Sequence, residues 1–287
     1  MDFGRLITAM VTPLDDQQRV NWDAVEPLID YLIDEQKSDA LVINGTTGES
    51  PTTTEEEKLR LVEIAVRHAK GRAKIIAGTG SNDTAHAIHL SRRTAQLGVD
   101  ALLLVAPYYN KPSQEGLYQH FKAVAEAVDV PIMLYNVPGR TGVNISAATT
   151  IRLSKIPNIV ATKDCTDTDQ LTELLNGIEP GFTVYSGEDA VTLPVLSIGV
   201  HGIVSVASHV VGKQMKAMIE AYLNGDVQSA AALHRELHPV FKGLFCAPSP
   251  APVKHALKVK GVDAGGVRLP LVPLTEQEAK FVESLLK

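Results

Sequence analysis

The sequence predicts an α/β protein built as a (β/α)8 barrel, and three observations lead to this fold class. Short apolar runs alternate with amphipathic segments through residues 1–224, which is typical of βα units around a parallel sheet. Eight such runs are present, the number that closes a TIM barrel, and the chain of 287 residues has a suitable length. A doubly wound sheet is the alternative, but it is disfavoured because the sequence has no G-x-G-x-x-G turn; Gly78-Thr79-Gly80 is too short a match.

The apolar runs and the segments between them define the expected elements. The strands are expected at Leu6–Val11, Ala40–Ile43, Lys74–Ala77, Ala101–Val105, Pro131–Leu134, Ile159–Thr162, Thr183–Tyr185 and Gly202–Ser205. The helices are expected at Trp22–Glu35, Thr54–Ala69, Asn82–Gln96, Gln114–Ala127, Ser146–Ser154, Thr168–Asn176, Asp189–Ser197 and Lys213–Leu223. Thr54, followed by three glutamates, is a typical helix start, and Gly98 a typical helix stop.

The residues after the eighth helix predict a C-terminal addition. Residues 225–287 contain three further helical patterns, at Val227–Leu244, Pro252–Val259 and Thr275–Leu286, with Pro248 and Pro250 at a connection. We therefore expect a catalytic barrel at 1–224 and a helical extension at 225–287 that packs on the barrel.

Composition excludes several classes of function. The net charge of −6 and the pI of about 5.9 argue against a nucleic-acid-binding protein, which normally carries a basic surface. No apolar run approaches the ~20 residues that span a bilayer, and the N-terminus lacks the pattern of a signal peptide. Two cysteines, Cys165 and Cys246, form neither a disulfide framework nor a metal quartet, and Cys165 is expected to be a buried, inert thiol. We expect a cytoplasmic protein without membrane or nucleic-acid partners.

One lysine stands out at the end of a predicted strand. Lys163 follows the apolar run Ile159–Thr162, which would carry its amine to the barrel mouth. In (β/α)8 barrels the catalytic groups lie at the C-terminal ends of strands. A buried amine in its neutral form attacks carbonyl groups to give a Schiff base. The alternative is a surface lysine paired with its neighbour Asp164.

The other strand ends favour the catalytic interpretation. Thr46 and Thr47 lie between glycines after the second strand, where hydroxyl and backbone N–H groups suit a small anion. Tyr135 follows the fifth strand, and a phenol placed there can transfer protons. Arg140 lies five residues later on a Pro/Gly loop, and a guanidinium can bind a carboxylate with two hydrogen bonds. Tyr109, after the fourth strand, suits either this site or an interface between subunits.

These motifs, in this order, resemble dihydrodipicolinate synthase, a family within the pyruvate-dependent lyases that include N-acetylneuraminate lyase. The resemblance covers essentially the whole chain. It rests on Gly45-Thr46-Thr47-Gly48-Glu49, Pro107-Tyr108-Tyr109, Tyr135-Asn136-Val137-Pro138 with Arg140-Thr141-Gly142, and Lys163.

The resemblance implies a synthase that joins pyruvate to L-aspartate 4-semialdehyde in the diaminopimelate route of lysine biosynthesis. Lys163 would form the imine with pyruvate, and Tyr135 would be the general acid and base. Thr46 would link Tyr135 to Tyr109, which in the family enters the site of a neighbouring subunit, so at least a dimer is implied and a homotetramer is expected.

The remaining implied contacts concern the substrates. Thr47 and the backbone at Val204 would hold the pyruvate carboxylate, and Arg140 would receive the carboxylate of the aldehyde. An iminium is itself an electron sink, so neither a cofactor nor a metal is expected.

The sequence departs from the family pattern both near the lysine and in a second region. Asp164-Cys165-Thr166 follows the lysine where Glu-Ala-Ser or Glu-Ala-Thr is commoner, and Glu188 stands where Asp is commoner. In the region that resembles a lysine feedback site, Lys58 replaces a histidine and His86 replaces a glutamate. Cationic groups there should repel the ammonium groups of lysine, so weak or absent inhibition is expected.

Three alternatives remain open from the sequence. A metal-dependent aldolase would need ligands, and His234 and His238 lie on one helix face, although a solvated face is the simpler interpretation. An enzyme of the same superfamily could use another aldehyde, such as N-acetylmannosamine. A non-catalytic barrel could bind a 2-oxo acid, but a mere binder needs no proton relay.

Overall fold

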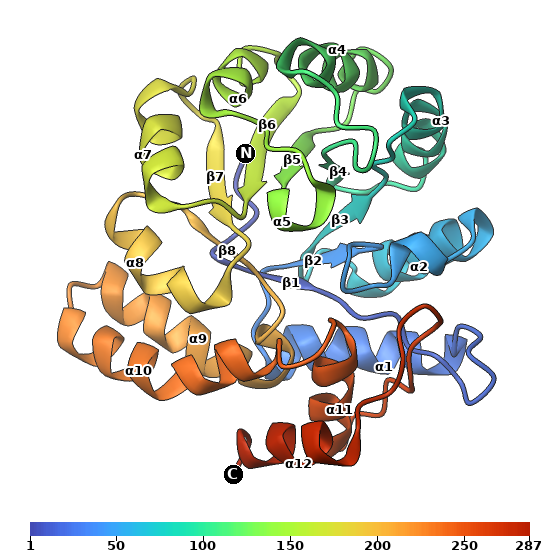
Figure 1. Ribbon diagram of the computed structural model, residues 1–287, viewed down its shortest axis with the longest axis vertical. Helices are drawn as coiled ribbons and strands as arrows, with labels where there is room; N and C mark the ends of the chain where they lie inside the picture. Colours follow the sequence, from blue (N-terminus) through green and yellow to red (C-terminus); the bar gives the residue numbers. More distant parts are fainter.

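The computed structural model describes residues 1–287 and shows a closed barrel of eight parallel strands in sequence order (Figure 1). The strands are β1 (Leu6–Ala9), β2 (Ala40–Ile43), β3 (Lys74–Gly78), β4 (Ala101–Val105), β5 (Ile132–Asn136), β6 (Ile159–Asp164), β7 (Thr183–Ser186) and β8 (Gly202–Ser205). β8 pairs with β1, and this pairing closes the sheet. The predicted fold class is therefore confirmed.

Helices surround the barrel and continue beyond it (Figure 1). They are α1 (Val25–Asp30), α2 (Glu55–Ala69), α3 (Thr84–Ala95), α4 (Gln114–Ala125), α5 (Pro138–Thr141), α6 (Ala147–Leu153), α7 (Thr168–Gly177), α8 (Thr192–Ser197), α9 (Ser208–Leu223), α10 (Val227–Gly243), α11 (Ala251–Val259) and α12 (Glu276–Ser284). Thr54 begins α2 with a capping box shared with Glu57, as the sequence pattern indicates.

Some boundaries differ from the prediction. Tyr135 and Lys163 lie within β5 and β6 rather than after them, because backbone pairing between these two strands continues through both residues. The short helix α5 was not expected, and α9 begins five residues before the predicted Lys213. The predicted helix Trp22–Glu35 consists of a 3-10 turn, α1 and a π-helical turn.

Side chains of opposite strand faces form two separate cores. Alternate strand residues such as Ile7, Val42 and Met133 fill the barrel interior, whereas their neighbours pack under the surrounding helices. Phe3 precedes β1 at the N-terminal end of the barrel, and its backbone N–H donates a hydrogen bond at 3.2 Å to the hydroxyl of the buried Tyr185 side chain, which reaches down from β7. The interior is thus filled at this end, and polar side chains occupy the other.

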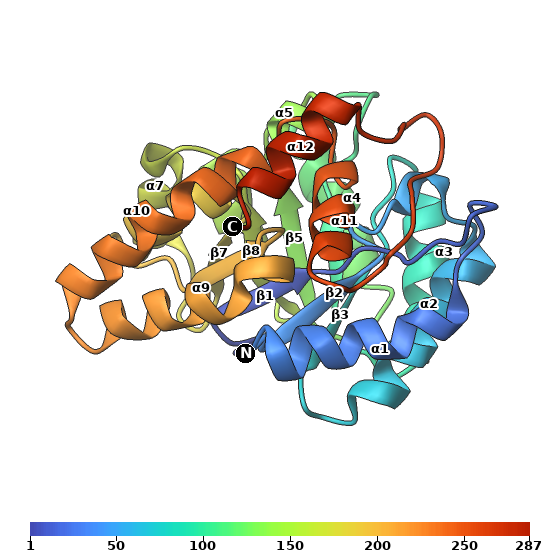
Figure 2. The same cartoon turned by 90° about the horizontal axis from the view of Figure 1, so that it is seen from below.

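The C-terminal helices lie along one side of the barrel. α10 and α11 both contact α9, and α12 contacts α11 (Figures 1 and 2). Figure 2 shows α12 toward the same end of the molecule as α5, which follows the C-terminal end of β5. No helix of the structure combines the length and the apolar character that a membrane span requires.

Candidate active site

The barrel mouth brings Lys163 against Tyr135. The two residues are direct partners in the parallel pairing of β5 and β6, so their side chains project to the same, interior face. The Lys163 Nζ lies 4.3 Å from the centroid of the Tyr135 ring, a cation–π distance. Lys163 is 7% exposed and Tyr135 5%. Strand register alone therefore creates the central pair of the site.

Asp164 faces away from this pair, so the alternative of a surface Lys163–Asp164 ion pair is wrong. Successive strand residues point to opposite faces, and the Asp164 carboxylate accepts hydrogen bonds from the Asn136 amide at 3.0 Å and from Thr166 and Gln170. Burial raises the pKa of Asp164, while the hydrogen bonds from Thr166 and Asn136 oppose that rise. Its role is to join the C-terminal ends of β5 and β6.

The β2–α2 loop supplies two hydroxyl groups. Thr46 lies at the pocket surface and Thr47 is buried. A tight turn places them there, with the Gly48 and Glu49 N–H groups donating to the Gly45 and Thr46 carbonyls, each at 3.1 Å. The end of β3 approaches the start of this turn closely. A Cβ on Gly78 would come within 2.2 Å of the Asn44 carbonyl oxygen, so glycine is needed there.

Arg140 reaches the mouth from the short helix α5. The Thr141 hydroxyl holds this turn by donating to the Val143 carbonyl at 2.8 Å, and Gly142 ends it in the left-handed region, with φ of 74°. The Arg140 side chain is exposed and forms no ion pair within the chain. It is therefore free to receive an anionic group.

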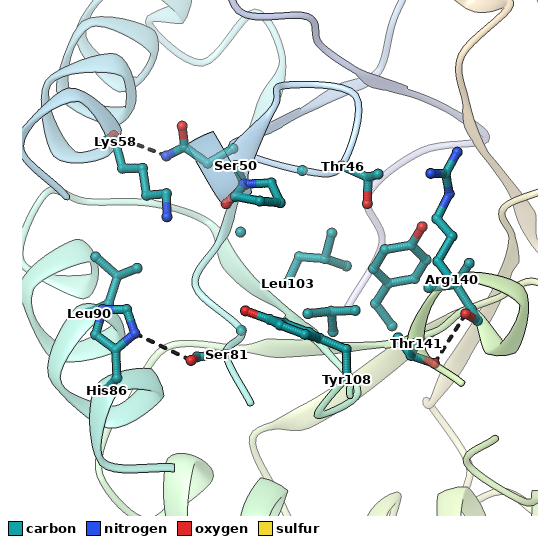
Figure 3. Close-up of a pocket in the computed structure, with 18 residues that line it drawn as sticks. Thr46, Ser50, Lys58, Ser81, His86, Leu90, Leu103, Tyr108, Arg140 and Thr141 are labelled. Carbon is teal, nitrogen blue, oxygen red and sulfur yellow. Dashed lines mark hydrogen bonds between the residues drawn. The ribbon is translucent and has the colours of Figure 1, made fainter. Parts of the chain in front are cut away.

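Two adjoining cavities share the residues Thr46, Tyr135, Val137 and Arg140. The first, of about 350 Å³, contains Lys163. The second, of about 440 Å³, extends toward α2 and α3. Figure 3 shows Lys58 and His86 on one side of this second cavity, with Arg140 and Thr141 on the other.

Two residues predicted for the site lie apart from these cavities. Val204 is 1% exposed, packs in the barrel interior and lines neither cavity, whereas Val206 lines the cavity of Lys163. Tyr109 is 89% exposed, with φ of 73°, and its N–H donates to the Thr141 carbonyl at 3.3 Å. A single chain therefore does not bring Tyr109 to Lys163.

The structure adds Gly187, Asp189 and Lys242 to the cavity of Lys163. The Asp189 carboxylate is 3% exposed and accepts the N–H groups of Val206 and Ala207 at 3.1 and 2.8 Å. Burial raises the pKa of Asp189, and these hydrogen bonds oppose the rise. An acid directly after β7 was visible in the sequence, but its partners after β8 were not.

Gly187 packs closely against the side chains of Lys163 and Cys165. A Cβ on Gly187 would lie 2.7 Å from the Lys163 Cε and 2.3 Å from the Cys165 Sγ, so only glycine leaves room for both. Cys165 is only partly buried and lines the cavity of Lys163, so the prediction of a buried thiol is wrong in that respect. Burial nevertheless raises the pKa of the thiol to about 12, which disfavours the reactive thiolate.

The histidine pair on α10 is remote from these cavities. The rings of His234 and His238 are 6.0 Å apart, and neither residue lines the cavities at the mouth. The chain holds no group of three or more His, Cys, Asp or Glu side chains arranged to bind a metal ion.

Fold and site together define the class: a (β/α)8 enzyme with a lysine amine at the C-terminal ends of its strands. A family model described as "Dihydrodipicolinate synthetase family" matches residues 2–287, and the chain belongs to this family. The 4-hydroxy-tetrahydrodipicolinate synthase of Bacillus subtilis is 52% identical over 288 residues, covering 100% of this chain and 99% of the relative.

Solved structures agree. The dihydrodipicolinate synthase of Bacillus anthracis has a TM-score of 0.98 and 51% identity, and the match covers 100% of this chain and 98% of that one. A structure described as the first monomeric dihydrodipicolinate synthase variant has a TM-score of 0.96 and 38% identity, covering 99% and 96% of the two chains. The predicted family, synthase activity and enzyme class are confirmed.

Proposed function

We propose that this chain joins pyruvate to L-aspartate 4-semialdehyde through an imine on Lys163. The observation that carries this proposal is the buried Lys163 amine, which lies against the Tyr135 ring and forms no ion pair, although Glu188 and Asp189 line the same cavity. Such an amine is suited to attack on a carbonyl group. The names of the full-length relatives support the choice of substrates.

The reaction would proceed through covalent intermediates. The Lys163 amine adds to the keto carbon of pyruvate, and loss of water leaves an iminium. Loss of a methyl proton converts the iminium to an enamine, whose carbon forms the new bond to the aldehyde carbon. Attack by the amino group of the aldehyde substrate on the imine carbon then closes the ring and releases Lys163. The protonated imine takes up the electrons, so no cofactor or metal enters these steps.

The remaining residues have proposed roles as well. Tyr135 transfers protons to and from the intermediates, with Thr46 linking it to Tyr109 of a neighbouring subunit. Thr47, which lines the cavity of Lys163, holds the pyruvate carboxylate, whereas Val204, whose backbone was predicted for the same role, does not line that cavity. Arg140, exposed and free of ion pairs at the mouth, binds the carboxylate of the aldehyde.

A homo-oligomer, at least a dimer and expected to be a homotetramer, follows from the role of Tyr109. Its exposed ring supports insertion into another subunit, as does the finding that it lines neither cavity of its own chain. The measurement is the mass in solution, with Tyr109→Phe assayed beside it. A fully active monomer would contradict this part of the proposal. The proposed compartment is the cytoplasm.

Borohydride reduction in the presence of pyruvate tests the covalent step. We expect a single adduct, which peptide mapping by mass spectrometry places on Lys163. No adduct, or an adduct on another lysine, would contradict the mechanism. A Lys163→Arg variant is the matched control, since it keeps a cation but cannot form a stable imine.

The aldehyde acceptor and the absence of a metal need separate assays. Turnover of pyruvate with aspartate 4-semialdehyde, compared with N-acetylmannosamine, separates this function from that of a neuraminate lyase. Activity should persist in the presence of a chelator. Loss of activity on chelation would favour a metal-dependent aldolase.

A further inference from the structure

A buried ion pair joins the β2–α2 loop to the C-terminal helices. The Glu49 Oε1 lies 2.7 Å from the Lys254 Nζ, and both side chains are 2% exposed. Lys254 lies on α11, 205 residues further along the chain, and its Nζ also donates to the Gly266 carbonyl at 2.6 Å. Charged side chains are rarely buried so completely unless they are paired.

The second oxygen of Glu49 is held from the same side. Glu49 Oε2 accepts the Arg268 backbone N–H at 2.8 Å. The Arg268 guanidinium donates to the Thr52 carbonyl at 2.8 Å and to both carboxylate oxygens of Glu57 at 2.7 and 2.8 Å. The segment after α11 therefore holds the loop at Glu49 and again at its end, where α2 begins.

Glu49 has a backbone conformation that is unusual for a residue with a side chain. Its φ of 55° and ψ of 36° lie in the left-handed region, which residues with a Cβ seldom adopt. The Glu49 N–H donates to the Thr46 carbonyl at 3.1 Å, so this conformation closes the turn that contains Thr46 and Thr47. Fixing the Glu49 side chain therefore restrains the backbone of the turn that carries both threonines.

We propose that Glu49 and Lys254 are positioning residues, through which the C-terminal extension holds Thr46 and Thr47 in register with Lys163 and Tyr135. Neither Glu49 nor Lys254 lines the two cavities at the mouth, so they act through the loop and not on the substrate. This inference rests on the proposed function, in which the two threonines serve the pyruvate imine.

Lys254→Met and Glu49→Gln test the proposal with the full-length chain. Each variant keeps the approximate size of the side chain and removes one charge of the pair. We expect kcat/KM for pyruvate to fall between about 10- and 100-fold, because small displacements of groups that orient a substrate have effects of this size. The rate at which pyruvate forms the borohydride-trapped adduct on Lys163 should fall in parallel. The fold decrease in kcat/KM of the double variant should be smaller than the product of the fold decreases of the two single variants.

Lys216→Met is the matched control. Lys216 on α9 pairs with Asp39 at 2.5 Å, and Asp39 precedes β2, at the end opposite Thr46. This change also breaks an ion pair between a late helix and β2, so it should lower the melting temperature and leave kcat/KM for pyruvate unchanged.

The outcomes separate the two claims. An adduct formed at an unchanged rate in both folded Lys254→Met and Glu49→Gln would overturn the positioning role alone. The same would follow if Lys216→Met lost as much activity as Lys254→Met. Failure of the unsubstituted chain to form an adduct on Lys163 would overturn the proposed function, and the positioning role with it.

Discussion

Lys163 and Tyr135 are direct neighbours across β5 and β6, with the lysine nitrogen 4.3 Å from the centre of the phenol ring. Backbone pairing at both residues holds this relationship, so it does not depend on a flexible loop. The ring covers the amine on one face, and the hydroxyl extends from the same side chain. A reaction that needs a nucleophile and a proton-transfer group side by side is served by this single pairing.

Tyr135→Phe should separate packing from proton transfer. The ring that contacts Lys163 remains, so we expect the melting temperature to stay close to that of the original chain. The loss of the hydroxyl should lower kcat by about 10²- to 10⁴-fold, the usual contribution of a general acid or base. Steady-state kinetics measure this effect, and an unchanged kcat would remove Tyr135 from the mechanism.

Gly187→Ala should displace the Lys163 side chain. The added methyl group would lie 2.3 Å from the Cys165 Sγ and 2.7 Å from the Lys163 Cε, so both side chains or the backbone at residue 187 must move. We expect kcat/KM for pyruvate to fall by about 10-fold or more. Gly139→Ala is the control, since a methyl group there meets no atom within 4 Å. Equal activity of both variants would show that the lysine adapts without cost.

Arg140→Gln should affect the second substrate and not the first. A charge-assisted pair contributes about 1.5–3 kcal/mol, which corresponds to a rise of roughly 10- to 100-fold in KM for the aldehyde. The rate of adduct formation with pyruvate should not change. A comparable effect on both substrates would argue that Arg140 shapes the mouth in general. Arg19→Gln, at an exposed ion pair with Asp15, is the control.

Inhibition by L-lysine should be weak. Lys58 and His86 line the same cavity as Ser50 and Tyr108. The feedback site that this region resembles has a histidine and a glutamate at these two positions. Their replacement by Lys58 and His86 removes groups that would bind the ammonium groups of lysine. Burial lowers the pKa of Lys58, although Glu55 opposes this shift. The double variant Lys58→His, His86→Glu should be more sensitive to lysine in a steady-state assay. Strong inhibition of the unsubstituted chain at low lysine concentration would contradict this prediction.

Acid should destabilise the fold through a buried histidine. Burial lowers the pKa of His209 from 6.5 to about 4, and its ring donates to the Val206 carbonyl and accepts the Val11 N–H. Below pH 6.5 the His209 ring binds a proton in the unfolded chain but stays neutral in the folded chain. The free energy of unfolding therefore falls as the pH falls toward 4. At pH 5 this amounts to about 2 kcal/mol.

Urea unfolding at pH 7 and pH 5 measures this effect, with His209→Gln losing less stability on acidification. Burial also lowers the pKa of His120 to about 4. His120 is present in both the original protein and the His209→Gln variant, so its effect on stability cancels when the two are compared. An equal loss in both chains would exclude His209 as the cause.

The relation between pattern and structure is clearest at β5 and β6. The apolar runs located both strands, yet each strand continues further than predicted, through Tyr135 and Lys163. Each predicted strand ended at the last residue of its apolar run, because hydrophobicity was the signal. The observed strands are longer because backbone hydrogen bonding does not depend on the polarity of the side chain. For the same reason the short helix α5, which a Pro/Gly-rich segment forms, was not expected.

The sequence by itself determined the barrel, the family and the place of Lys163, Tyr135, Thr46 and Arg140 at strand ends. The barrel follows from the periodicity of residues close in the chain, which reports burial directly. The family was indicated by the resemblance of short motifs such as Gly45-Thr46-Thr47-Gly48-Glu49. Only the tertiary structure decided that Asp164 faces away from Lys163, that Gly187 must be a glycine, and that Glu49 pairs with Lys254. Such relationships depend on how distant segments pack, and no local pattern encodes the approach of two residues 205 positions apart.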